Sequence, residues 1–215
     1  MTTTTDIANH ALSLVSEKRL VSMDSPGELA AVVKLHLASS VREVLSNFPW
    51  RCARRRATLA RLATPPAFGW RHQYQLPADF LRVVSINGSL CGSENRTIFE
   101  VEGTVLLTNA DNCQIVYVYD ILQGGLDSNI GELDALCAEA IYTKLAIALS
   151  YTLTQNLQRE QVLRSAYETV SQRARSKSQR DALENTVPFY EGETVTASRH
   201  GALPFATHHF PFTTF

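Results

Sequence analysis

Apolar residues in the first third of the chain recur at positions i, i+3 and i+4, the spacing of an amphipathic helix. Asp6 is placed to cap a first helix of about 12 residues, because its side chain can accept hydrogen bonds from the free N–H groups of the first turn. A second helix is expected over residues 26–48. A third is expected over residues 51–63, ended by Thr64-Pro65-Pro66. The pattern therefore predicts three helices before residue 67.

Between Trp70 and Ile121 the pattern changes to short β-branched and aromatic runs separated by turn residues. Asn87-Gly88 and Gly103-Thr104 are typical of tight hairpin turns. The predicted strands cover residues 73–76, 80–86, 98–102, 105–108 and 114–119. We interpret this segment as a small antiparallel meander.

The last predicted strand is apolar on both faces. Ile115, Tyr117 and Tyr119 share one face, and Val116 and Val118 share the other. A strand of this kind is buried on both sides, either inside its own subunit or against another one. Val116 and Val118 are therefore candidates for packing between subunits.

Two more helices are predicted after the strands, over residues 129–155 and 159–181. In the second half of the first of these, Ile147, Leu149 and Leu153 widen the apolar stripe until most of the circumference is apolar. Such a helix is buried on more than one side. These three residues are further candidates for packing between subunits.

Together the patterns predict an α+β protein: a helical bundle with long antiparallel helices, a small inserted antiparallel β meander and an extended C-terminal tail. At 215 residues the chain is long enough for a sizeable core. The predicted segments are the N-terminal helices of the bundle at 1–66, the β module at 67–123, the C-terminal helices of the bundle at 124–183 and the tail at 184–215.

The tail has neither helical nor strand periodicity, yet it is rich in aromatic residues. Disordered tails are normally poor in aromatics, because low hydrophobicity is what keeps them unfolded. Burying one Phe is worth roughly 1.5–3 kcal/mol, so we expect the tail to dock onto a partner or a neighbouring subunit. The candidate docking residues are Phe189, Tyr190, Phe205, His208, His209, Phe210, Phe212 and Phe215.

Composition narrows the class of protein. The chain is 45% hydrophobic and 19% charged with a formal net charge of −1, so no strong overall field draws it to nucleic acid or acidic lipid. Its four cysteines lack CxxC spacing, which favours reduced thiols over a disulfide framework or a zinc site. No secretory leader pattern opens the sequence, and no uncharged apolar run approaches the roughly 20 residues that span a bilayer. We expect a soluble intracellular product without membrane contact.

An arginine cluster without acidic neighbours occupies the third predicted helix: Arg51, Arg54, Arg55, Arg56 and Arg61. Three interpretations remain open for it. The cluster can be a solvated helix face, a contact with the acidic surface of a partner, or a contact with DNA phosphates. Nothing nearby in the sequence has the pattern of a recognition helix.

Other residues offer little for chemistry. His208-His209 with His200 would be a weak metal site, because no spaced cysteine or carboxylate accompanies them. Asp79 follows Leu76-Pro77-Ala78 and is interpreted as a turn residue that accepts backbone hydrogen bonds rather than as a catalytic acid. The sequence contains no GxSxG, P-loop, HExxH or GxGxxG motif. We therefore predict no catalytic, cofactor-binding or metal site, and a protein that is not an enzyme.

Several blocks of residues do resemble a known family. They are Asp6-Ile7-Ala8-Asn9 with Ala11-Leu12, Phe48-Pro49-Trp50 followed by Ala53, Trp70, Tyr74-Gln75-Leu76-Pro77-Ala78-Asp79-Phe80-Leu81-Arg82-Val83, Glu100-Val101-Glu102-Gly103 ahead of Leu107-Thr108, and Tyr117 with Tyr119-Asp120-Ile121. Over roughly residues 6–180 the chain resembles the tail tubular protein A family, the head-to-tail adaptors or gatekeepers of tailed bacteriophages. It departs from the family at Glu17-Lys18-Arg19, where members often carry a glycine, and at Cys52, where an aromatic is common.

The resemblance implies a structural virion protein at the head–tail interface, assembled in the host cytoplasm. Its implied partners are identical subunits in a ring, commonly of twelve copies, the phage portal protein and a distal tail or nozzle protein, with packaged DNA passing through the lumen. The ring would help retain that DNA and provide the attachment platform for the next tail component. The alternative hypothesis is a nucleic-acid-binding accessory protein that acts through the Arg51–Arg61 segment.

Overall fold

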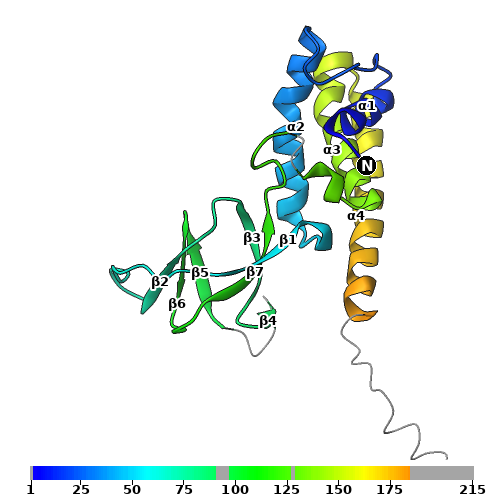
Figure 1. Ribbon diagram of the computed structural model, residues 1–215. Helices are drawn as coiled ribbons and strands as arrows, with labels where there is room; N and C mark the ends of the chain where they lie inside the picture. Colours follow the sequence, from blue (N-terminus) through cyan, green and yellow to red (C-terminus); the bar gives the residue numbers. More distant parts are fainter. Residues whose placement is uncertain (1, 91–96, 127–128, 185–215) are drawn as a thin grey trace, which may run out of the picture. The chain divides into compact units, whose positions relative to one another are not determined.

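The computed structural model describes residues 2–90, 97–126 and 129–184. The chain divides into two units, Met1–Gln179 and Arg180–Phe215. Within the described residues every helix and strand lies in the first unit, except the end of the last helix. The described residues form helices and two antiparallel sheets, which confirms the α+β class (Figure 1).

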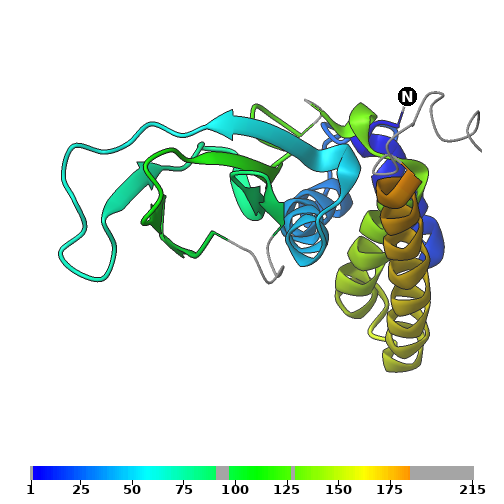
Figure 2. The same cartoon turned by 90° about the horizontal axis from the view of Figure 1, so that it is seen from below.

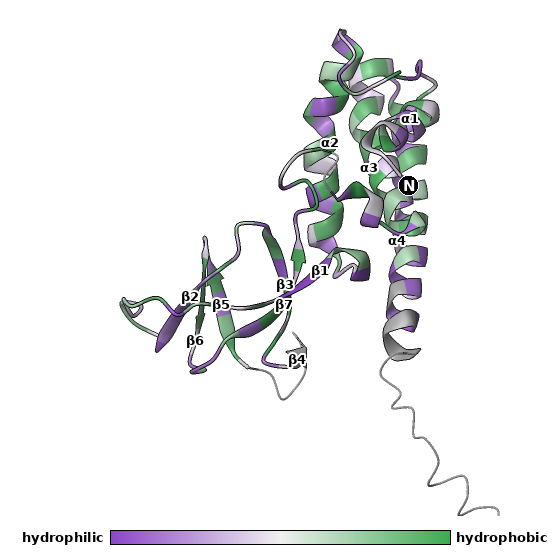
Figure 3. Ribbon diagram, in the orientation of Figure 1, coloured by the Kyte–Doolittle hydropathy of each residue, from purple (hydrophilic) through white to green (hydrophobic). Residues whose placement is uncertain are grey.

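The helices are α1 (Thr4–Leu14), α2 (Glu28–Asn47), α3 (Ala135–Thr154) and α4 (Leu157–Glu184), with short 3₁₀ helices η1 (Arg51–Ala53) and η2 (Ile130–Glu132). Both α1 and α2 pack against α3. Figure 3 shows apolar residues gathered along α3, and ten of its side chains are buried, among them Leu145 and Leu149. The prediction that this helix is enclosed on several sides is confirmed.

The start of α1 differs from the prediction. The capping residue is Thr3 rather than Asp6: the Thr3 side chain accepts from the Asp6 backbone N–H at 3.1 Å, and the Thr3 backbone N–H donates to the Asp6 carboxylate at 2.9 Å. This reciprocal capping box satisfies two N–H groups at once. Hydrogen bonds from Thr3 are also the largest cause of the lowered pKa of Asp6.

The strands are β1 (Arg54–Thr58), β2 (His72–Gln75), β3 (Phe80–Ile86), β4 (Ser89–Leu90), β5 (Phe99–Glu102), β6 (Val105–Thr108) and β7 (Gln114–Tyr119). They form two sheets, ordered β1-β7-β3-β4 and β2-β6-β5, instead of one meander. Both predicted hairpin turns are present. Asn87 and Gly88 have φ of 47° and 80°, and Gly103 has φ of 56°, the left-handed region that primed turns require.

The segment predicted as a third helix is mostly a strand. Only Arg51–Ala53 forms a helical turn, and Arg54–Thr58 then pairs antiparallel with β7, Ala57 lying opposite Ile115. Figure 2 shows β1 along the border of the strands, followed by the long loop to β2. A helix here would have offered only small alanines for burial, whereas the strand gains a hydrogen-bonded ladder against an apolar strand.

One hydrophobic core connects the helices with the strands, and Trp50, Tyr74 and Tyr119 are its largest fully buried side chains. Trp50 donates its indole N–H to the Val44 carbonyl at 2.7 Å, which fixes the chain as it leaves α2. Among the described residues α3 alone is long and apolar enough to cross a membrane by length and composition. Because its apolar side chains line this core, that property carries no argument for a membrane.

Candidate functional site

The five arginines do not form one helical face. Arg51 lies in η1, three lie in β1, and Arg61 forms an isolated bridge with Tyr74. Arg54 is turned back on the chain, where its guanidinium donates to the Pro49 carbonyl at 3.1 and 2.6 Å, and burial lowers its pKa. Arg54 is therefore a structural residue, which its sequence position did not reveal.

Arg55 belongs to a polar cluster on one face of the four-stranded sheet. Its guanidinium lies 2.9 Å from Asp79 Oδ2, and the Tyr117 hydroxyl donates to Asp79 Oδ1, also at 2.9 Å. Asp79, in the turn before β3, thus binds two side chains, whereas the sequence had indicated backbone hydrogen bonds. Asp79 is only 8% exposed, and both of its carboxylate oxygens have a partner.

Tyr119 extends the cluster toward the helices. The Arg55 guanidinium carbon lies 3.7 Å from the centre of the Tyr119 ring, a cation–π contact, and the Tyr119 hydroxyl donates to Glu132 in η2. Burial raises the pKa of Tyr117 and that of Tyr119 to about 12, with the carboxylate partners adding to the effect. Both phenols are therefore protonated near neutral pH and act as hydrogen-bond donors to the two carboxylates. The cluster ties β1, β7, the β2–β3 turn and η2 together.

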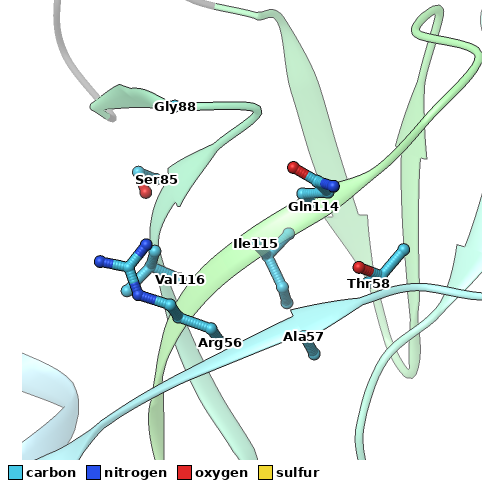
Figure 4. Close-up of a pocket in the computed structure, with 8 residues that line it drawn as sticks. All are labelled: Arg56, Ala57, Thr58, Ser85, Gly88, Gln114, Ile115 and Val116. Carbon is cyan, nitrogen blue, oxygen red and sulfur yellow. The ribbon is translucent and has the colours of Figure 1, made fainter.

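A shallow groove of about 430 Å³ crosses the other face of the four-stranded sheet (Figure 4). Arg56, Thr58, Ser85, Gln114 and Val116 contribute to its lining. Figure 4 shows Arg56 toward one end and Thr58 with Gln114 toward the other. Within residues 2–90, 97–126 and 129–184, no side-chain hydrogen bond or ion pair involves Arg56, so its charge is available to a partner.

The residues predicted to pack between subunits are mostly enclosed by their own chain. Val118 and Leu149 are fully buried and Ile147 is 8% exposed, so this prediction is wrong for these three. The physical reason is that α1 and α2 cover α3, and α2 also contacts β7. Of the five candidates, Val116 and Leu153 keep part of their surface exposed.

The aromatic tail lies outside the described residues. This applies to all of its candidates: Phe189, Tyr190, Phe205, His208, His209, Phe210, Phe212 and Phe215. Their docking role stays a prediction. Among the residues that the structure does describe, no group of three or more His, Cys, Asp or Glu side chains is arranged to hold a metal ion.

Exposed apolar side chains were not singled out from the sequence. Phe68, in the β1–β2 loop, is 87% exposed, and Tyr151, Leu157 and Val162 around the α3–α4 connection are 60%, 62% and 66% exposed. The only sequence signal for Phe68 is its position between Pro66 and Gly69, which places it in a loop. For the other three, the apolar pattern alone does not distinguish a core position from a surface one.

Comparison with known proteins adds no assignment. No family model and no curated protein matches the chain.

Proposed function

We propose that this protein is a structural virion protein, a ring-forming head-to-tail adaptor that lies below the portal. The ring would help retain packaged DNA and would provide the attachment platform for the next tail component. The observation that carries the proposal is the resemblance of residues 6–180 to the tail tubular protein A family, above all in residues 74–83. Assembly rather than chemistry would then be the mechanism.

One feature of the described chain supports an assembling protein. The large apolar side chains around the α3–α4 connection and at Phe68 are exposed, and covering such groups releases free energy of about 25 cal/mol per Å². In the proposal the helices form the body of the ring, the β module faces the distal tail component, and residues 184–215 dock on the portal or a neighbouring copy.

Removal of residues 188–215 tests the docking part. We expect the truncated chain to remain folded, because the described helices and strands all end by Glu184, and to lose most of its affinity for the portal of the same phage. Circular dichroism would report the fold, and mass photometry of protein–portal mixtures the complex. A full-length chain that never binds the portal or forms a ring around it would overturn the adaptor proposal.

The rival function is nucleic-acid binding through the arginine segment, and one observation favours keeping it. In the described part of the chain, the side chains of Arg51, Arg56 and Arg61 have no acidic partner, whereas Arg54 and Arg55 are occupied. If they bind phosphates, DNA affinity will fall steeply with salt, and Arg56→Ala with Arg61→Ala will flatten that dependence. Arg71→Ala, an exposed arginine outside the segment, is the control.

A further inference from the structure

The edge strand β1 has a free side. Within the described residues β7 is the only strand paired with Arg54–Thr58. The free side is short, because directly after β1 the Ala60 carbonyl and the Leu62 N–H are bonded to β2. The Leu59 N–H donates to the Cys113 carbonyl at 2.8 Å, which makes Leu59, and by alternation Ala57 and Arg55, the residues bonded to β7. The backbone groups of Arg56 and Thr58 therefore point away from the sheet, as does the Arg54 carbonyl. Within the described residues these backbone groups form no hydrogen bond with another backbone group.

A second free edge lies in the other sheet. Among the residues that the structure describes, β6 is the only strand beside β5, and the two are joined by the two-residue turn Gly103-Thr104. Such a turn makes Glu102 and Val105 a hydrogen-bonded pair, so Glu100 is also bonded to β6 while the N–H and C=O of Val101 point outward. The exposed residues of this strand are Glu100, Val101 and Glu102.

The two edges carry opposite charge. On β1, Arg54 and Arg56 lie on one face, and on β5 the same is true of Glu100 and Glu102. Antiparallel pairing would match residues whose backbone groups point outward with each other, setting Arg54 or Arg56 opposite Val101 or Phe99. The arginine that then meets a glutamate is Arg55, whose guanidinium is already bound to Asp79. In parallel pairing, a residue whose backbone groups point away from its own sheet lies opposite a residue whose backbone groups are bonded within its own sheet. The arginines of β1 then lie opposite the glutamates of β5.

We propose that the β1 edge of one copy of this protein pairs in parallel with the β5 edge of the next. Arg56 then lies opposite Glu102, and this is the ion pair that the contact adds. Arg54 lies opposite Glu100, but its guanidinium stays bonded to the Pro49 carbonyl and Glu100 accepts from the Trp70 indole, so this second pair contributes only at longer range. The Arg56 N–H donates to the Val101 carbonyl, and the Val101 N–H donates to the Arg54 carbonyl. Glu102 of the second copy reaches the rim of the groove beside Arg56. Because the two edges differ, the contact is head-to-tail, and repeating it gives a closed ring or an open filament.

The test uses two single charge reversals, Arg56→Glu and Glu102→Lys. Within the described chain neither side chain has a hydrogen bond or ion pair, so neither change removes an internal contact. Each variant alone places like charges opposite each other, and we expect its self-association, measured by sedimentation velocity over a concentration series, to weaken about tenfold or more. Glu168→Lys, an exposed reversal on α4, is the control and should associate as the unaltered protein does.

Mixing the two variants tests whether their loss of association comes from the contact between Arg56 and Glu102. In the mixture the reversed β1 edge of one variant can meet the reversed β5 edge of the other, and their two unaltered edges can meet as well. Alternating copies should therefore regain association. A misfolded variant could not do so, which separates loss of the contact from loss of the fold. Absence of rescue in the mixture, association that neither reversal weakens, or an unaltered protein that stays monomeric at all concentrations would overturn the pairing.

This inference rests on the self-association in the proposed function, but the two can fail separately. Rings seen by negative-stain microscopy that survive both reversals would overturn the strand pairing and leave the adaptor proposal standing. Open filaments that both reversals dissolve would support the pairing and contradict a ring-forming adaptor. Closed rings that dissolve and are restored by mixing would support both.

Discussion

Asp79 is the residue on which the polar cluster depends, because it is the one group that binds both a cation and a phenol. Arg55 reaches it from β1 and Tyr117 from β7. Burying a carboxylate is costly unless its oxygens are paired, and here both are. The sequence placed Asp79 in a turn but could not identify these partners, since they lie 24 and 38 residues away along the chain.

Two substitutions at Asp79 separate its roles. Asp79→Asn can keep its Oδ1 as the acceptor for Tyr117. It removes the charge and places an NH2 group, a donor, where Oδ2 accepted from the half-exposed Arg55, so we expect a loss of about 1 kcal/mol in the free energy of unfolding. Asp79→Ala also leaves the buried Tyr117 hydroxyl without an acceptor, raising the loss to roughly 2–3 kcal/mol. Urea denaturation measures both. Equal losses for the two variants would show that the Tyr117 hydrogen bond contributes nothing.

The two buried tyrosines predict a pH dependence. Their pKa in the folded protein is about 12, against an ordinary value of 10.0 that applies to the unfolded chain. Below pH 10 both states hold the phenolic protons; above it the unfolded state releases them first. The free energy of unfolding should therefore fall as the pH rises from about 10 to about 12. In Tyr117→Phe this fall should be shallower, as measured by urea denaturation at each pH. An unchanged slope would contradict the assignment.

At the level of the elements, the sequence predicted what short-range patterns determine. Alternation and turn residues located β3, β6 and β7, and the helical spacing located α1 to α4. Where it failed, the outcome depended on distant partners. Residues 54–58 become a strand because β7 lies beside them, and Val118 is buried in a strand that packs against both β1 and α2. No local pattern contains that information.

The burial of α3 within its own chain can be tested through Leu149. Because this side chain is fully buried by the protein itself, Leu149→Ala should cost about 2–5 kcal/mol of unfolding free energy. The cost should not depend on protein concentration, whereas an interface residue would show a dependence. Tyr151→Ala, which alters a side chain that is 60% exposed on the same helix, serves as the comparison. A concentration-dependent effect of Leu149→Ala would restore the original interpretation of an interface.

At the scale of the whole molecule, the protein divides its apolar residues between a core that joins helices and strands and a smaller set left at the surface. The core needs no second copy, because the candidates Val118, Ile147 and Leu149 are already covered. Any contact between copies must therefore use surface groups rather than the core helices. What the isolated chain leaves open is the pair of strand edges and the apolar side chains around the α3–α4 connection.

If copies associate through these surface groups, substitutions at the exposed apolar side chains should weaken assembly while leaving the stability of the fold almost unchanged. In a double variant Leu157→Ser and Val162→Ser, two exposed side chains lose apolar area, so the free energy of unfolding should change by no more than about 0.5 kcal/mol. If a neighbouring copy or the portal covers them, assembly followed by mass photometry should need a severalfold higher protein concentration. Gln161→Ser, an exposed polar change on the same helix, controls for altered helix propensity. Normal assembly of the double variant would mean that these residues stay in solvent, leaving the strand edges as the surface through which copies associate.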